Sequence, residues 1–145
     1  MKAEEIMTSS PRTVTQNQTV AEAVGVMTTE NCGIVPVVES EGSLTIVGVI
    51  TDRDIALRAC GTDGSGPQST VSSIMTSNVF CVAPQDDISR ISHVMESAGV
   101  RRVPVVSDEQ QLVGIISFKD LASNTDDAEV GSLESTILEL DPNNS

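Results

Sequence analysis

The stretch VGVITDRDIA, Val47–Ala56, occurs a second time as VGIISFKDLA, Val113–Ala122, 66 positions further along the chain. In each copy an apolar, largely β-branched run ends at a hydroxyl residue, and an aspartate follows three positions later. Apolar β-branched runs favour strands, and the spacing hydroxyl-x-x-acid is the capping box that starts a helix. The stretch therefore predicts a strand that leads directly into a helix, and it predicts this twice.

The repeat continues toward the start of both copies at an offset of 68. IMTS occurs at Ile6–Ser9 and at Ile74–Ser77, and VPVV occurs at Val35–Val38 and at Val103–Val106. Two extra residues in ESEGSLTI of the first copy reduce the offset to 66, which a hairpin loop tolerates. One copy, at about 55 residues, is small for a stable core of its own. We therefore expect the two copies to fold as a pair.

Each copy is predicted to have the order β-α-β-β-α. In the first copy Val14 lies in a short strand, and the following helix carries apolar residues at helical spacing: Val20, Ala23, Val24 and Met27. Thr19 and Glu22 form a capping box for this helix. The second copy repeats the pattern with Ile88, Ile91 and Met95.

Two strands and a final helix complete each copy. IVPVV and LTIVGVI are expected to form a hairpin that turns at Glu41-Gly42 and is buried on both faces. The final helix begins at Thr51 in the first copy and at Ser117 in the second. Its apolar residues in the first copy are Ile55, Leu57 and Ala59. The predicted fold class is α/β (α+β), with two β-α-β-β-α units packed as a pseudo-twofold pair around two equivalent clefts.

The expected organisation follows from the repeat and from composition. Residues 1–60 form the first unit, 61–70 a Gly/Ser/Pro linker, 71–124 the second unit and 125–145 an acidic tail. Within the tail, VGSLESTILEL (Val130–Leu140) is a candidate short helix.

Composition excludes several classes of partner. The net charge is −13, Trp and Tyr are absent, and Phe80 and Phe118 are the only aromatic residues, so neither nucleic acid nor an anionic membrane is an expected partner. The chain has no long apolar run and no apolar signal segment at its start. Its three cysteines, Cys32, Cys60 and Cys81, form no CxxC pair. We expect a cytoplasmic protein with reduced thiols, in which Cys60 and Cys81 serve packing.

The repeated aspartates Asp54 and Asp120 have two compatible interpretations. The first is capping alone. The second is ligand binding: a helix start attracts phosphate, the hydroxyl of Thr51 or Ser117 adds a hydrogen bond, and the carboxylate accepts hydrogen bonds from a ribose diol.

Two adjacent arginines, Arg101 and Arg102, precede the second VPVV, whereas the first copy has Gly33 and Ile34 there. Such arginines are either solvated, paired with a surface acid, or available to bind phosphate.

The sole histidine, His93, is expected at the surface. No metal-binding spacing is favoured and no catalytic set is visible, so we do not expect an enzyme.

The repeat resembles a CBS motif, named for cystathionine β-synthase, and the pair resembles a CBS tandem, or Bateman module. IMT, VPVV and the two long stretches carry this resemblance across about residues 4–123. It implies binding of AMP, ADP or ATP, ahead of S-adenosylmethionine, in clefts between the motifs. Thr51 and Ser117 would then contact phosphate, and Asp54 and Asp120 the ribose.

The resemblance also implies residues that hold the adenine, and it assigns Arg101 and Arg102 to phosphate. The adenine residues are Thr13, Val14, Ile34, Val35 and Pro36 in the first copy, and Cys81, Val82, Val100, Val103 and Pro104 in the second. CBS tandems commonly form disc-shaped homodimers, and a bare tandem would act on an effector protein that the sequence does not identify.

Two hypotheses for function follow. One is a regulatory module that senses an adenosine nucleotide. The other is a constitutive scaffold for dimerisation whose clefts are empty or degenerate. The first copy lacks the arginine pair, so Arg53 or an arginine of the second copy would have to supply the positive charge, and Phe118 stands where the first copy has Asp52. We therefore expect unequal affinities at the two sites.

Overall fold

The computed structural model describes residues 1–61, 64 and 66–124, and the chain divides into two compact units. Unit 1 contains Met1–Pro11 and the chain from Phe80 onward, and unit 2 is Arg12–Val79. The predicted acidic tail and its candidate helix lie outside the described residues. Within the described residues, no helix has the length and apolar character that crossing a membrane requires.

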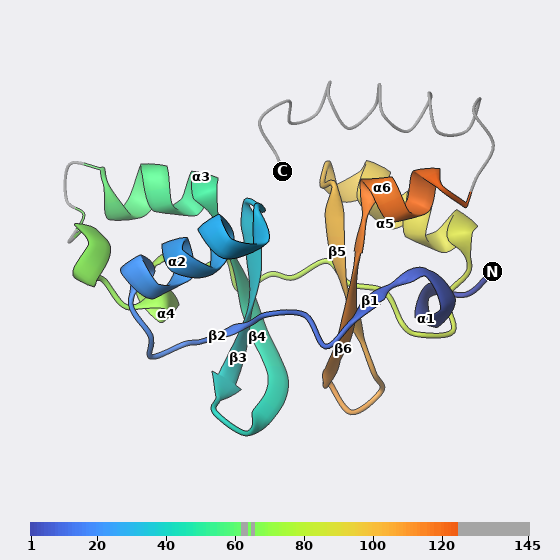
Figure 1. The fold of residues 1–145 in the computed structure, drawn as a ribbon, viewed down its shortest axis with the longest axis horizontal. Coiled ribbons are helices and arrows are strands. Elements are labelled where there is room, and N and C mark those ends of the chain that lie inside the picture. Colours follow the sequence, from blue (N-terminus) through green and yellow to red (C-terminus); the bar gives the residue numbers. More distant parts are fainter. Residues whose placement is uncertain (62–63, 65, 125–145) are drawn as a thin grey trace. The chain divides into compact units, whose positions relative to one another are not determined.

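Unit 2 is a three-stranded sheet covered by helices (Figure 1). The strands are β2 (Val14–Thr15), β3 (Ile34–Ser40) and β4 (Ser43–Thr51), in the order β2-β3-β4. β2 runs parallel to β3, and β3 and β4 form the predicted antiparallel hairpin, which turns at Glu41-Gly42. The helical elements are α2 (Val20–Glu30), α3 (Asp52–Asp54), the π-helix η1 (Ile55–Ala59), the 3₁₀ turn η2 (Gly66–Gln68) and α4 (Val71–Ile74).

The capping box predicted for α2 is confirmed. Thr19 Oγ1 accepts a hydrogen bond from Glu22 N at 3.2 Å, and Thr19 N donates to Glu22 Oε1 at 3.2 Å. Val20, Ala23 and Met27 are buried as predicted and belong to the same apolar cluster as β3. The prediction for Val24 is wrong, because this residue lies at the edge of the apolar stripe and its side chain is 42% exposed.

Leu57, named above among the apolar residues of the final helix, is 62% exposed. The helix that follows α3 is a π-helix, in which Cys60 N donates to Ile55 O five residues earlier. This wider winding changes which side chains share a face, so Ala59 is buried while Leu57 points outward.

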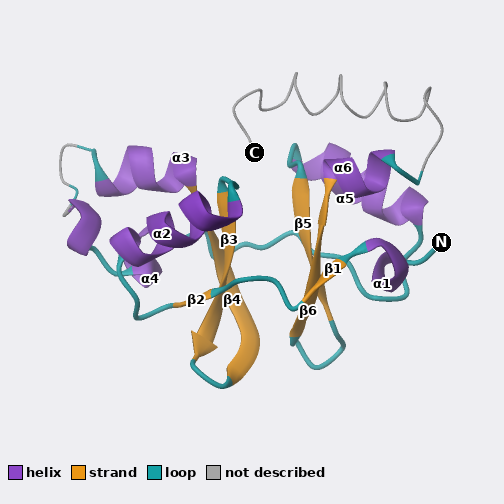
Figure 2. Cartoon of the chain, viewed as in Figure 1, coloured by secondary structure: helices purple, strands orange, loops and turns teal. Residues whose placement is uncertain are grey.

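Unit 1 has the corresponding architecture (Figure 2). Its sheet has the order β1-β6-β5 and is antiparallel throughout, with Val82 bridging in parallel to Val105 where unit 2 has β2. The elements are α1 (Ala3–Ile6), β1 (Thr8–Ser9), α5 (Ile88–Ala98), β5 (Arg102–Val106), β6 (Leu112–Ser117) and α6 (Phe118–Ala122). Asp87 caps α5 by accepting from Arg90 N at 2.9 Å.

Burial on both faces is confirmed for the VPVV strands, but it is wrong for the first half of β4, where Leu44 near the hairpin turn is 50% exposed. All five residues Ile34–Val38 of β3 are buried, as are Val103–Val106 of β5. The strand β6 instead alternates between buried and half-buried residues, with Leu112, Gly114 and Ile116 buried. Each unit therefore buries its VPVV segment completely.

The leading segment of each repeat folds into the unit formed by the other repeat. In unit 1, β1 pairs with β6 of the second repeat, so that Thr8 lies opposite Ile115. In unit 2, Thr76, which follows α4, bridges to Val49 of β4, and their backbone hydrogen bonds measure 2.8 and 2.9 Å. The sequence repeats and the compact units therefore divide the chain at different residues.

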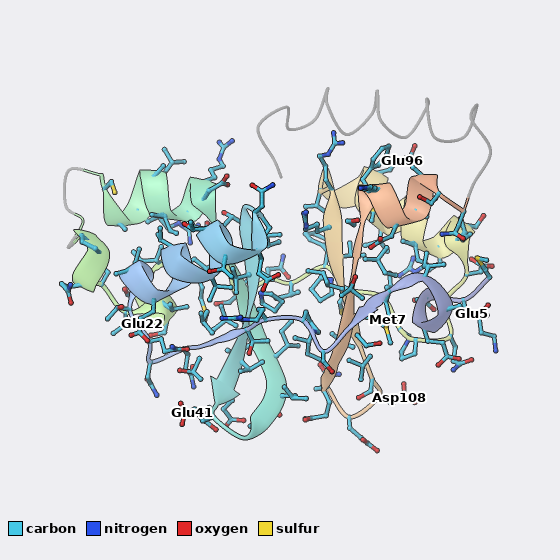
Figure 3. All side chains as sticks on the ribbon, viewed as in Figure 1. Glu5, Met7, Glu22, Glu41, Glu96 and Asp108 are labelled. Atoms are coloured by element: carbon cyan, nitrogen blue, oxygen red, sulfur yellow. The ribbon has the colours of Figure 1, made fainter. Side chains whose placement is uncertain are left out.

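Glycine makes room for each docked segment. A Cβ at Gly48 would lie 2.8 Å from Thr76 O and 2.9 Å from Met75 Sδ. A Cβ at Gly114 would lie 3.0 Å from Thr8 O and would also meet the sulfur of Met7, which Figure 3 labels on the segment after α1. Both glycines are therefore required for a close backbone approach rather than for an unusual φ.

We predict that Gly48→Ala destabilises the fold by about 1–3 kcal/mol, because the new methyl group overpacks against Thr76 and Met75. Urea unfolding followed by circular dichroism measures this. Gly25→Ala in α2 is the matched control: nothing lies within 4 Å of its Cβ position, and a helical alanine stabilises by about 0.5–1 kcal/mol. Equal stability of the two variants would contradict the close approach at Gly48.

A second prediction concerns pH. Hydrogen bonds from the Gln18 side chain and from Thr19 N lower the pKa of Glu22, which lies at the start of α2 (Figure 3). A lowered pKa in the folded state stabilises the fold above the unfolded pKa, and the gain is lost as the pH falls through the folded pKa. Wild type should therefore exceed Glu22→Gln in urea midpoint at neutral pH, with the difference vanishing in acid. Glu41→Gln, in the exposed hairpin turn, should show no such dependence.

Candidate functional site

The two repeated hydroxyl-x-x-Asp motifs form reciprocal capping boxes at the ends of β4 and β6. In unit 2, Thr51 Oγ1 accepts from Asp54 N and Thr51 N donates to Asp54 Oδ2, both at 3.0 Å. In unit 1, Ser117 Oγ accepts from Asp120 N at 3.1 Å and Ser117 N donates to Asp120 Oδ2 at 3.0 Å. The capping interpretation is therefore confirmed for both motifs, and it uses one carboxylate oxygen of each aspartate.

The carboxylate of Asp54 has further partners within unit 2. The hydroxyl of Thr76 lies 3.0 Å from Oδ1 and 3.2 Å from Oδ2, and donates to the carboxylate. Arg58 Nη1 lies 3.9 Å from Oδ1. Asp54 is only 8% exposed, so both of its oxygens are enclosed by protein donors.

The carboxylate of Asp120 is more open. Asp120 is half-buried, and among the residues that the structure describes only Ser117 N donates to its carboxylate. Asn124 occupies the position that corresponds to Arg58, and its Nδ2 donates to the backbone oxygen of Asp120 at 2.8 Å. Oδ1 of Asp120 is therefore a carboxylate oxygen without a donor in the described part of unit 1.

Arg101 lies directly beside this motif. Its guanidinium lies over the ring of Phe118, 4.8 Å from the ring centroid, and its backbone oxygen accepts from Phe118 N at 2.7 Å. Cation–π contact of this kind fixes the position of a guanidinium and leaves its N–H donors available. Arg102 is half-buried and lies opposite Ser117 in the β5–β6 register. Within residues 1–61, 64 and 66–124, neither arginine forms an ion pair.

Unit 2 has no counterpart of this cation. Gly33 takes the place of Arg101, and its backbone oxygen accepts from Asp52 N at 2.9 Å. Asp52 is exposed where Phe118 is buried. The backbone at this point is therefore the same in both units, while the side chains differ in charge and polarity.

The remaining predicted residues fall into the same two units. Unit 2 contains Thr13, Val14, Ile34, Val35 and Pro36, and unit 1 contains Cys81, Val82, Val100, Val103 and Pro104. Sheet register places Ile34 opposite Thr51, and Val82 N donates to Pro104 O at 3.0 Å. Val14, Val35, Val82 and Val103 belong to the apolar cores. Any contact from these four to a ligand would therefore come from their backbone.

The cysteines differ from the prediction that Cys60 and Cys81 serve packing. Both are exposed, because Cys60 follows the last turn of η1 and Cys81 alternates with the buried Val82 in an extended segment. Partial desolvation of the sulfur and the negative charge of Asp86 raise the pKa of Cys81, so its thiol is less reactive than an ordinary one. Cys32 is half-buried, and its sulfur lies 3.3 Å from Ile34 O.

Two functional candidates, Thr76 and Arg58, were missed from the sequence. The signal for Thr76 was its place in the second IMTS, which repeats Thr8, but no local pattern indicated that this segment reaches Asp54. The signal for Arg58 was its position four residues after Asp54 on a helix.

His93 is exposed, as predicted. The described residues contain no group of three or more His, Cys, Asp or Glu side chains that could hold a metal ion.

Comparison with known proteins gives consistent results. The sequence model of the CBS domain matches residues 3–59 and 71–126. The CBS domain-containing protein YhcV of Bacillus subtilis is 42% identical over 120 residues, which cover 81% of each chain. The crystal structure of a conserved CBS domain protein of Thermoplasma acidophilum covers 94% of this chain and 75% of its own, with 25% identity and a TM-score of 0.80.

A second similar structure is the CBS domain pair of protein MJ0100, which was solved in complex with 5′-methylthioadenosine and S-adenosyl-L-methionine. It is 28% identical, has a TM-score of 0.71, and covers 85% of this chain and 98% of its own. The matched residues include both repeats, both capped aspartates and both sheets. The chain therefore belongs to the CBS-domain family and carries two CBS domains in tandem.

Proposed function

We propose that the chain is a regulatory module that binds an adenosine-containing ligand through its CBS domains and signals the bound state to a partner protein. The observation that carries this proposal is the open carboxylate of Asp120 beside Ser117 and Arg101. The adenosine ligands of the MJ0100 domain pair support it, because that pair has the same fold and is 28% identical.

The chemistry of unit 1 fits a ribose with an anionic substituent. Asp120 Oδ1 has lone pairs available for the hydroxyl groups of a ribose diol. Ser117 Oγ already accepts from Asp120 N, yet it retains its own proton, which it can donate to a phosphate oxygen. Arg101 supplies the positive charge, and its contact with Phe118 limits the entropy lost on binding. AMP, ADP and ATP carry this combination of groups, and S-adenosylmethionine shares the ribose.

The finer parts of the proposal concern regulation. A ligand changes the state of a protein only through different affinities for two conformations, so the module must have a second conformation that a partner recognises. We place this module in the cytoplasm as a homodimer that acts on a separate effector protein. The three free thiols support the location, because such thiols persist in a reducing compartment.

One observation favours the alternative of a constitutive scaffold for unit 2. The carboxylate of Asp54 is already satisfied by protein donors, and no arginine stands at Gly33 or Ile34. If unit 1 also binds nothing, the fold serves dimerisation and docking alone.

We predict that Asp120→Asn weakens binding by about 1–3 kcal/mol, because the ligand diol loses hydrogen bonds to a charged acceptor. Isothermal titration calorimetry with AMP, ADP, ATP and S-adenosylmethionine measures this. Asp108→Asn, in the exposed turn between β5 and β6 (Figure 3), removes the same charge elsewhere and should leave affinity unchanged. Absence of binding for all four ligands to wild type would refute the proposed function and favour the scaffold.

We also predict that Arg101→Met lowers affinity for AMP more than for adenosine, by about 1.5–3 kcal/mol, because only AMP presents a charged phosphate to the guanidinium. Arg90→Met, on the exposed side of α5, makes the same charge change and should alter neither affinity. An equal loss for AMP and adenosine would show that Arg101 supports the fold rather than the phosphate.

A further inference from the structure

The two capped aspartates share one sequence motif, but their carboxylates accept hydrogen bonds from different donors. From this difference we infer that Thr76 and Arg58 form an internal latch on Asp54, which keeps the unit 2 site closed and leaves Asp120 of unit 1 as the acceptor available to a ligand. This inference rests on the proposed function for its consequence in binding. The latch itself is a property of the fold and can be tested without any ligand.

The donors around Asp54 account for its closed state. Thr51 N donates to Oδ2, and the hydroxyl of Thr76 lies within hydrogen-bond distance of both oxygens. The guanidinium of Arg58 approaches Oδ1 at 3.9 Å. A carboxylate that is 8% exposed and has donors on both oxygens is stable as it stands, since a buried charge without partners is costly.

The latch is anchored on both sides. The backbone of Thr76 pairs with Val49 of β4, which fixes its hydroxyl above the start of α3. Arg58 Nη1 donates to Ile74 O at 3.0 Å and to Met75 O at 3.1 Å. These carbonyls belong to the last turn of α4, where oxygens lack partners within the helix. Arg58 thus connects η1, α4 and the carboxylate of Asp54.

Unit 1 contains the same segment without the latch. Thr8 corresponds to Thr76 and occupies the same position opposite the edge strand, facing Ile115 as Thr76 faces Val49. Yet Thr8 is exposed, and in the described part of the chain its hydroxyl makes no hydrogen bond. The arginine is replaced by Asn124, whose shorter side chain bonds the backbone of Asp120 instead. Both members of the latch, the hydroxyl contact and the arginine, are therefore missing from the described part of unit 1.

This asymmetry sets the order of binding. At Asp120 a ribose hydroxyl adds a hydrogen bond to Oδ1, which accepts from no donor in the described part of unit 1. At Asp54 it must first displace the hydroxyl of Thr76, so the exchange yields little net free energy. A ligand should therefore bind the unit 1 site with higher affinity than the unit 2 site. The hydroxyl of Thr76, and not the capping box, causes this difference in affinity.

The binding test uses the full chain and two matched variants. Thr76→Val removes the hydroxyl but keeps the β-branched shape, and Thr8→Val makes the same change where no latch exists. With AMP and S-adenosylmethionine as calorimetric probes, wild type should show one site per chain, and Thr76→Val should gain a second site whose affinity is raised about tenfold or more. Thr8→Val should match wild type. Two equal sites in wild type, or no gain in Thr76→Val, would overturn the role of the latch in binding.

A ligand-free test separates failure of the latch from failure of the proposed function. Urea midpoints of Thr76→Val, Asp54→Ala and the double variant should be non-additive, because each single change already breaks the shared hydrogen bond. The corresponding cycle with Thr8→Val and Asp120→Ala should be additive. Additivity in the first cycle would refute the latch even if a ligand binds. Coupling in the first cycle without binding of either probe would uphold the latch as a structural device and refute the proposed function.

Discussion

The close backbone approach of each leading segment to an edge strand is the constraint on which the rest of the structure depends. β1 pairs with β6 over Gly114, and the segment after α4 pairs with β4 over Gly48. Because each segment begins the repeat whose body lies in the other unit, neither repeat supplies its own edge. A single repeat would expose unpaired N–H and C=O groups along this edge. The tandem arrangement is therefore needed to complete the backbone hydrogen bonds of each sheet, and not only to provide a core of sufficient size.

The same constraint brings a hydroxyl to the capped aspartate. Thr76 reaches Asp54 because its backbone is held against Val49, one residue beyond the glycine that admits the segment. Capping does not exclude a second role for the same side chain, since the capping box occupies one carboxylate oxygen and leaves the other. In unit 1 that oxygen has no donor among the described residues, and in unit 2 the hydroxyl of Thr76 donates to it. A difference in tertiary contact thus gives two identical local motifs different chemistry.

Local patterns predicted much of the fold. The capping boxes at Thr19, Thr51 and Ser117 and the hairpin turn at Gly42 depend on residues within a few positions of each other, and all are present. The exposure of Val24, Leu57 and Cys81 was not predictable in the same way. It depends on the width of the covered helix face, on the π-helical winding of η1 and on the alternation of one extended segment.

The part of the site that could not be predicted from the sequence is the contact between Thr76 and Asp54, which are distant in the chain. Thr8 and Thr76 stand in identical IMTS segments, yet only Thr76 bonds the aspartate of the unit into which it is docked. A second difference is Arg58, which donates to two carbonyls at the end of α4, whereas Asn124 at the corresponding position donates to the backbone of Asp120. Duplication gave both units the same acceptor and the same hydroxyl. Divergence four residues after the aspartate, with Arg58 in unit 2 and Asn124 in unit 1, accompanies the different donors around the two carboxylates in the described part of the chain.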